Sequence, residues 1–379
     1  MAAPLDTTGR RLTDEQRLAW LQLIRSENVG PRAFRDLLNH FGGAAAALEA
    51  LPELARRGGA LLSPRVFPRQ QAQAEIAALE RLGARLVALG EPDFPTVLAA
   101  ADGAPPLIAL RGSAEVLALP AVAIVGARNA SAAGRSFALR LAQDLGSRGF
   151  CVVSGLARGV DATAHEAALR TGTVACLAGG LDRIYPPENE PLLARILDNG
   201  GAAITEMPLG WEPRARDFPR RNRVIAGLSR AVVVVEAALR SGSLITARLA
   251  LEMGREVMAA PGSPLDPRCE GSNRLLRDGA TLITSADHVV EALEPILREA
   301  LPVPPEAFLS EDDDDPAALE HDDSARARIE ELLGPSPASV DDLVRLSGQP
   351  VRLVLLVLLE LELAGRLERL PGNRIARKD

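Results

Sequence analysis

The 379-residue sequence has one lysine, Lys378, three cysteines and only 3% aromatic residues. The cysteines show no Cys-x-x-Cys spacing and two of them lie in apolar runs, which favours buried, reduced thiols over a disulfide or a zinc site. No GxxxxGKS/T motif is present, which disfavours a P-loop ATPase. The N-terminal segment lacks the apolar stretch of a signal peptide, and the longest apolar run near the C-terminus, Leu353–Leu359, is far shorter than the roughly 20 residues of a membrane span. We therefore expect a cytoplasmic protein with no membrane segment.

The sequence has 43 basic and 50 acidic residues, so its formal net charge is −7 at pH 7. Nucleic-acid-binding proteins, in contrast, are usually basic. The charge is unevenly distributed: residues 304–323 carry nine acidic residues and no lysine or arginine, which leaves the rest of the chain at about +2. The basic residues are nearly all arginine, which suits bidentate phosphate contacts and stacking on bases, although a high-GC genome gives the same bias. The composition is therefore compatible with a nucleic-acid partner.

Seven short apolar segments, rich in β-branched residues, alternate with helical patterns in the middle of the chain. These predicted strands are residues 121–127, 151–155, 173–180, 202–207, 231–238, 256–262 and 281–284. The alternation predicts an α/β fold, a doubly wound and largely parallel sheet whose strands are buried on both faces. We assign this Rossmann-like domain to residues 79–300.

Two smaller domains and a linker are predicted around the sheet. Residues 10–78 place Asn28–Pro31 between two apolar-periodic segments, which predicts a helical SAM-like or helix-hairpin-helix-like domain; a plain helical hairpin fits equally well. Residues 301–323 are acidic and without periodicity, which predicts an extended linker. Three helical patterns and a hairpin in residues 324–379 predict a winged helix, loosely tethered by that linker.

The third helix of this winged helix, expected at about residues 350–364, is unusually apolar. It offers Arg352 but also Glu360 and Glu362, whereas a helix that reads a DNA groove needs polar and basic side chains at the base edges. We therefore expect protein contact or plain packing from this helix, and at most a phosphate contact from the basic hairpin that follows it.

Loops at the carboxyl ends of the predicted strands are rich in glycine, hydroxyl groups and arginine. Ligands of such sheets bind at these ends, and helix N-termini with glycines and hydroxyl groups favour anions. The first loop has Arg128 where a dinucleotide-binding loop would need bare glycine. The most basic stretch, residues 211–223, contains five arginines together with Trp211 and Phe218. Arginines beside aromatic rings favour a single nucleic-acid strand over a mononucleotide.

Six segments that follow one another through residues 105–295 strongly resemble the DNA-processing protein A (DprA/Smf) family. They are VAIVGAR, VVSGLARGVDATAHEAAL, LAGGLDRIYPPEN, FPRRNRVIAGLSRAVVVVEA, SGSLITARLALEMGREVMAAPGS and GSNRLLRDGA. The resemblance implies an extended Rossmann-like domain that binds and protects single-stranded DNA during natural transformation. It further implies loading of the RecA recombinase, displacement of single-strand-binding protein, a homodimer and no catalysis.

The family's strand-binding pocket uses the arginine of the first glycine loop and residues of an F-x-x-R-N-R stretch, here Arg128 and Phe218, Arg221, Asn222 and Arg223. Together with the other strand-end loops, the expected DNA-binding residues are Gly126, Arg128, Asn129, Ser154, Gly155, Arg158, Phe218, Arg221, Asn222, Arg223, Ser241, Ser243 and Thr246. We expect the side chains of Arg128, Arg221 and Arg223 to end in solvent. We expect no catalytic residue, no cofactor and no metal.

Several side chains also allow an enzymatic interpretation. Asp161 and His165 share a helix face and could form a general-base pair or half a metal site, although a capping aspartate beside a hydrogen-bonded histidine is favoured. Glu206 and Glu236 follow strands and could be acid–base carboxylates; orienting the nearby arginines is favoured. Asn222 could cap a helix instead of contacting phosphate.

The alternative function is a Rossmann-like nucleotide-processing enzyme, similar to the phosphoribohydrolases of the lysine-decarboxylase-like group. Those proteins carry PGGxGTxxE, and the nearest segment here, SGSLITARLALE, lacks that pattern. A winged-helix regulator of duplex DNA is a third possibility, which the apolar third helix disfavours.

Overall fold

The computed structural model describes residues 11–298, 323–370 and 374–378, and these residues form two compact units. The sheet unit comprises residue 11 and residues 75–298, and the helical unit comprises the remaining described residues. The predicted linker lies almost wholly outside the described residues, as does the turn at residues 371–373. None of the described helices is long and apolar enough to cross a membrane.

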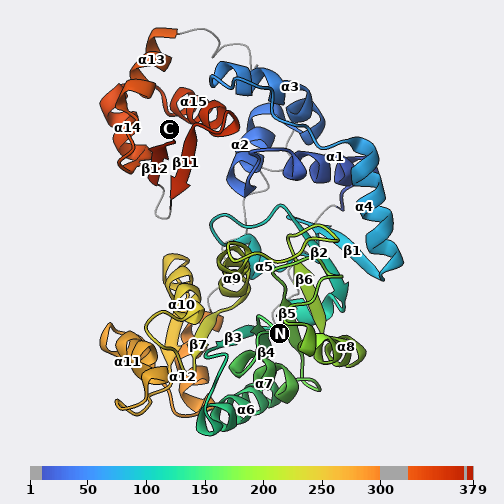
Figure 1. The fold of residues 1–379 in the computed structure, drawn as a ribbon, viewed down its shortest axis with the longest axis vertical. Helices are drawn as coiled ribbons and strands as arrows, with labels where there is room; N and C mark the ends of the chain where they lie inside the picture. The colour runs from blue at the N-terminus through green and yellow to red at the C-terminus, as the bar shows by residue number, and fades with distance from the viewer. Residues whose placement is uncertain (1–10, 299–322, 371–373, 379) are drawn as a thin grey trace. The chain divides into compact units, whose positions relative to one another are not determined.

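The sheet unit is built on nine strands in the order β1-β2-β6-β5-β4-β3-β7-β8-β9 (Figure 1). Their bounds are β1 Ala84–Ala88, β2 Leu107–Gly112, β3 Ala121–Val125, β4 Cys151–Ser154, β5 Thr173–Cys176, β6 Ala202–Thr205, β7 Ala231–Val234, β8 Glu256–Ala259 and β9 Thr281–Leu282. The seven strands from β6 to β9 in this order are parallel. The predicted doubly wound α/β fold is therefore confirmed.

Two features of the sheet differ from the sequence-based prediction. Strands β1 and β2, which were not predicted, add an antiparallel edge beside β6. The predicted strands also end earlier than expected: β5 stops at Cys176, whereas the apolar run continues to residue 180. The surplus residues form loops at the carboxyl edge, because glycines there let the chain turn away from the sheet.

Helices cover both faces of the parallel strands. Helices α6 (Ala132–Ser147), α7 (Val160–Ala167) and α12 (Ala286–Arg298) share one core with β3, β4 and β7. Successive strand residues point to opposite faces, and α9 (Asp217–Leu228) and α10 (Gly242–Glu252) pack together against these strands on the other face. The remaining elements are α5 Thr96–Ala99, α8 Glu190–Asp198, α11 Glu270–Arg277 and the 3-10 turns η1 Glu115–Ala118, η2 Pro187–Asn189 and η3 Pro267–Cys269. The strand order reverses at β3, between β4 and β7, which is where ligands of such sheets bind.

The helical unit combines the N-terminal helices with the C-terminal domain. Helices α1 (Asp14–Arg25) and α2 (Pro31–Phe41) flank the predicted hairpin turn, in which Asn28 has a φ of 61° and Pro31 begins α2. Helix α3 (Ala44–Arg57) follows, and α4 (Arg69–Arg81) leads into the sheet unit. The C-terminal elements are α13 Asp323–Leu332, β10 Ala338–Ser339, α14 Val340–Ser347, α15 Val351–Leu363, β11 Leu367–Leu370 and β12 Arg374–Arg377.

The C-terminal elements have the order of the predicted winged helix, with a core formed by α13, α14, α15 and the β-hairpin. The expectation that this domain is loosely tethered is wrong, because α15 also contacts α2 and α3 (Figure 1). The helix is therefore buried on two sides, and among its residues only Val351 and Arg352 in the first turn are exposed.

Candidate nucleic-acid interface

A pocket of about 200 Å³ opens at the carboxyl ends of β3, β4 and β5. Its lining comes from three strand-end loops and from the first turns of α9, as the sequence predicts for a ligand of this sheet. The lining residues are Arg128, Asn129, Gly155, Ala157, Arg158, Tyr185, Pro186, Phe218 and Arg221. Six of the thirteen predicted site residues are therefore brought together in one pocket.

One wall of the pocket is aromatic. Tyr185 and Phe218 meet edge to face with their ring centroids 5.4 Å apart, and Tyr185 is 47% exposed. The Arg128 guanidinium carbon lies 5.5 Å from the Phe218 ring centroid, within the range of a cation–π contact. Arg128 is exposed and, within the part of the chain that the structure describes, makes no ion pair. This wall therefore combines aromatic rings, on which a planar group could stack, with the Arg128 guanidinium, which could bind an anion.

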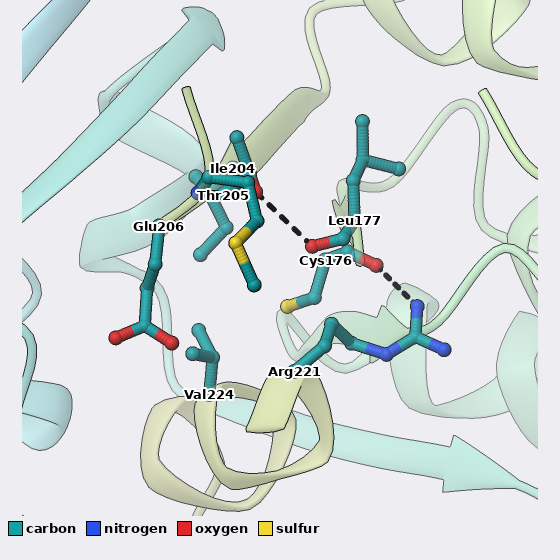
Figure 2. A pocket seen from close by; sticks show the side chains of 8 residues that line it. Cys176, Leu177, Ile204, Thr205, Glu206, Arg221 and Val224 are labelled. Atoms are coloured by element: carbon teal, nitrogen blue, oxygen red, sulfur yellow. Dashed lines mark hydrogen bonds between the residues drawn. The ribbon is translucent and has the colours of Figure 1, made fainter. Parts of the chain in front are cut away.

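Arg221 reaches the same pocket but is 8% exposed. Its Nη1 donates to the carbonyl oxygens of Gly155 at 2.5 Å and of Cys176 at 2.6 Å, the second of which is drawn in Figure 2. Burial lowers the pKa of Arg221, while the charge of Asp161 opposes this shift. The prediction that this side chain ends in solvent is wrong, because it ties α9 to the ends of β4 and β5. A Cβ at Gly155 would lie 2.7 Å from the guanidinium, so a glycine is needed there.

Arg223 points away from the pocket. Its Nη2 lies 2.6 Å from Glu206 Oε1, and Arg220 Nε lies 3.6 Å from the other carboxylate oxygen. Figure 2 shows the Glu206 carboxylate and the Arg221 guanidinium on opposite sides of a cavity of about 10 Å³, which is barely the space of one water molecule. The prediction that Glu206 orients arginines is confirmed, and the expected solvent-facing end of Arg223 is replaced by an ion pair.

Glu236 has a different partner from the one expected. Its carboxylate accepts hydrogen bonds from the Ser131 backbone N–H at 2.9 Å and from the Ser131 hydroxyl at 2.5 Å, at the N-terminus of α6. A Cβ at Gly134 would lie 2.5 Å from this carboxylate. A helix N-terminus attracts anions, and here the chain's own carboxylate fills that position. The α6 N-terminus is therefore not open to an external anion, and the exposed cation of this loop is the Arg128 side chain.

Six other predicted site residues are hydrogen-bonded, closely packed or buried within the protein. Ser154 is buried and donates to the Ile124 carbonyl at 2.7 Å. A Cβ at Gly126 would lie 2.7 Å from Val160 Cγ2, so this glycine allows close packing. Asn222 donates to the Gly242 carbonyl at 3.2 Å. Ser241 is the N-cap of α10, and its hydroxyl accepts from the Ser243 backbone N–H and lies 2.7 Å from the Ser243 hydroxyl. Ser243 and Thr246 are buried. None of these six lines the pocket.

Asp161 and His165 do not form a pair with each other. Asp161 Oδ2 accepts from the Gly155 N–H at 3.0 Å, and burial raises its pKa while the charge of Arg221 lowers it. His165 Nδ1 lies 2.7 Å from Thr173 Oγ1, and burial together with the charge of Arg221 lowers the pKa of His165 to about 3. Asp161 thus holds the loop after β4, whereas His165 contacts the first residue of β5. Among the described residues, no group of three or more His, Cys, Asp or Glu side chains could hold a metal.

The sequence analysis missed Ala157, Tyr185 and Pro186 as lining residues. Tyr185 is the chain's single tyrosine and lies in the LAGGLDRIYPPEN segment, so a rare aromatic residue in a strand-end loop was the available signal. The segment also supplies Glu188, which forms an ion pair with Arg158 at the pocket edge. The pKa of Glu188 is lowered by a hydrogen bond from its own backbone and by Arg158.

Three family models match the chain in order. The model described as DNA recombination-mediator protein A matches residues 85–294, a DprA-like N-terminal HHH domain matches residues 14–78, and a DprA winged helix domain matches residues 313–373. Protein Smf of Escherichia coli is 39% identical over 314 residues, which are 82% of each chain.

Two solved structures are similar to this chain. The X-ray structure of DNA processing protein A from Streptococcus pneumoniae is 32% identical, with a TM-score of 0.61 over 74% of this chain and 98% of that one. DNA processing protein A from Helicobacter pylori, whose structure is described as giving insight into a "unique single-stranded DNA binding mode", is 29% identical, with a TM-score of 0.51 over 56% and 96% of the two chains. With its central domain and both flanking domains matched in order, the chain belongs to the DNA recombination-mediator protein A (DprA/Smf) family.

Proposed function

We propose that this protein binds single-stranded DNA in the pocket between the strand-end loops and α9, and acts as a recombination mediator. The observation that carries the proposal is the juxtaposition of the exposed Arg128 with the ring of Phe218, beside Tyr185. Stacking of bases on aromatic rings is tolerant of sequence, and an arginine adds the charge that the phosphate backbone needs. The Helicobacter pylori relative, described as binding single-stranded DNA, supports the same assignment.

In this proposal the residues of the pocket divide the recognition between them. Arg128 neutralises a phosphate, because the α6 N-terminus is already filled by Glu236. A base stacks against Tyr185, which is half exposed and braced by Phe218. Arg158 can contact a second phosphate once that phosphate competes with Glu188. Arg221 holds the loops in place from within the protein.

The finer role follows from membership of the family. We propose that the protein works in the cytoplasm as a homodimer, protects single-stranded DNA during natural transformation, and loads RecA while displacing single-strand-binding protein. We propose no catalytic step, and two observations support this: Glu206 is paired with arginines and Glu236 with the α6 N-terminus, so neither carboxylate is placed to activate a nucleophile.

The test is fluorescence anisotropy with matched single-stranded and duplex oligonucleotides across a salt series. Arg128→Ala should weaken single-strand binding by about tenfold and reduce the slope of log affinity against log salt by about 0.7, the value for one phosphate on a single strand. Phe218→Ala should weaken binding with less change in slope, because stacking releases no counterions.

The matched control is Arg140→Ala, which removes an exposed arginine of α6 that does not line the pocket. It should leave both affinity and slope unchanged. A folded Arg128→Ala protein with the affinity and salt slope of the unmodified protein would remove the pocket assignment.

A further inference from the structure

The third helix of the winged helix, α15, has two buried faces. One face carries Val354, Val357, Leu358 and Leu361 into the core of its own domain. The other face carries Leu359, Glu360 and Leu363, which are at most 2% exposed and lie outside that core. This second face packs against α2 and α3 of the N-terminal domain. The apolar character of α15 in the sequence is thereby explained.

Polar contacts fix the same interface at its edge. Arg369, on β11, lies 3.0 Å from Asp36 of α2 and 2.6 Å from Glu362. Arg366 donates to the Gly58 carbonyl at 2.9 Å, and Arg326 pairs with the buried Glu360. Buried carboxylates need such partners, since an unpaired buried charge is costly. Arg366 and Arg369, two arginines of the predicted basic hairpin, are therefore bound to protein.

The hairpin turn of the N-terminal domain takes part as well. The Asn28 side chain donates to the Leu363 carbonyl at 2.9 Å, at the end of α15. At the end of α3 the two backbones meet directly, because a Cβ built on Gly58 would lie 2.0 Å from the carbonyl oxygen of Glu360. Such a close approach of two chains is possible only at a glycine.

In helix-turn-helix proteins the recognition helix turns its outer face to the major groove and reads it with polar side chains. Here the first turn of α15, with Arg352, is exposed, whereas the outer face from Leu359 to Leu363 is buried. We propose that the winged helix of this protein is a docking module for the N-terminal helical domain and not a reader of duplex DNA. The docking surface of the winged helix is the buried outer face of α15 together with Arg366 and Arg369. Its partner is the surface of α2 and α3 with the turn between α1 and α2. The proposal is independent of the single-strand pocket, which lies in the sheet unit.

Gly58→Ala tests the docking in the full-length protein. Gly58 has a φ of −69°, so alanine suits its own backbone, and the added methyl group strikes only the partner surface. Amide hydrogen exchange in the last turns of α3 and α15 should become at least tenfold faster than in the unmodified protein. Gly43→Ala is the matched control, at the other end of α3, where an added Cβ meets nothing within 4 Å. Equal exchange in the two variants would overturn the docking.

Duplex binding tests the second half of the proposal. A matched duplex added to the unmodified protein should leave exchange at the contact unchanged, and Gly58→Ala should alter duplex affinity by less than threefold. Should Gly58→Ala fail to fold, Asn28→Gly removes the contact to Leu363 and suits the positive φ of residue 28. A tenfold gain in duplex affinity in either variant would show α15 to be a DNA reader masked by docking, and would overturn the proposal. Single-strand affinity, followed in parallel, should not change.

Discussion

Arg128 and Arg221 line the same pocket, but their guanidinium groups have different surroundings. Arg128 is exposed against the Phe218 ring, whereas Arg221 is buried and donates to two backbone carbonyls. A buried cation that is removed leaves its acceptors unpaired, and a buried carboxyl near it loses its counter-charge. Asp161 is that carboxyl here. The two arginines should therefore differ in what their loss does to the protein.

We expect Arg221→Ala to lower the free energy of unfolding by about 3 kcal/mol, whereas Arg128→Ala should change it by less than about 0.5 kcal/mol, as for an exposed residue. Urea denaturation of the two variants followed by circular dichroism measures this. Equal stability of the two variants would contradict the structural role assigned to Arg221. Because Arg221→Ala also perturbs the loops, loss of DNA binding in that variant alone would not identify a DNA contact.

His165 makes stability depend on pH. Burial holds its pKa at about 3 in the folded protein, against 6.5 for the ordinary side chain. The unfolded chain therefore binds a proton that the folded protein does not, and stability falls as the pH drops below 6.5, by about 1.4 kcal/mol per pH unit, until the pH reaches about 3. The raised pKa of Asp161 acts in the opposite direction at acidic pH.

The measurement compares the slope of unfolding free energy against pH in the unmodified protein and in His165→Asn, between pH 6 and about 4.5. The variant should be less stable throughout but should lose the part of the slope that His165 supplies. A slope that is the same in both proteins would show that His165 is protonated in the folded state.

At the scale of elements, the strands and their loops could be predicted from the sequence, but the contacts across the site could not. Apolar runs and glycines placed seven strands and brought Arg128, Arg158 and Phe218 to one edge. The sequence predicted an anion site at the α6 N-terminus. It could not show that Glu236, more than 100 residues away, reaches Ser131 and occupies that position. Arg221 likewise looks like any surface arginine in the sequence, and only packing against Gly155 shows that it is buried. Strands β1 and β2 were not predicted, because an antiparallel edge breaks the βαβ alternation on which the prediction relied.

The occupied N-terminus of α6 gives an element-scale prediction. Glu236→Gln should lower stability by about 1 kcal/mol, because a neutral amide interacts less favourably with the helix dipole and with the Ser131 donors. It should leave single-strand affinity unchanged, because the position remains filled. Thermal denaturation and anisotropy on the same preparation measure both quantities. Tighter DNA binding in Glu236→Gln would mean that phosphate reaches α6 after all.

At the scale of the whole molecule, the pocket belongs to the sheet unit and the winged helix to the helical unit. We expect truncation after residue 298 to keep single-strand affinity within a few-fold of the full chain. Removal of the acidic residues 304–323 should tighten binding at low ionic strength, and the gain should fade as salt screens these charges. A truncated protein that loses most of its affinity at every salt concentration would make the C-terminal region a principal DNA-binding element.

The same truncation should destabilise the N-terminal helices, because it removes α15 and exposes the surface of α2 and α3 that α15 covers. Hydrogen exchange in α2 and α3 should become faster while exchange in β3 and β4 stays the same. Unchanged exchange in α2 and α3 would argue that these helices are stable without the winged helix.

The helical unit is assembled from the two ends of the chain, which has a consequence for synthesis on the ribosome. Helix α3 ends at Arg57 and its partner α15 begins at Val351, so about 290 residues are translated in between. At a translation rate of about 5–20 residues per second, the apolar surface of α2 and α3 remains uncovered for about 15–60 s before α15 is synthesised. The sheet unit is completed during that interval, so the nascent chain folds its middle before it can close its first domain.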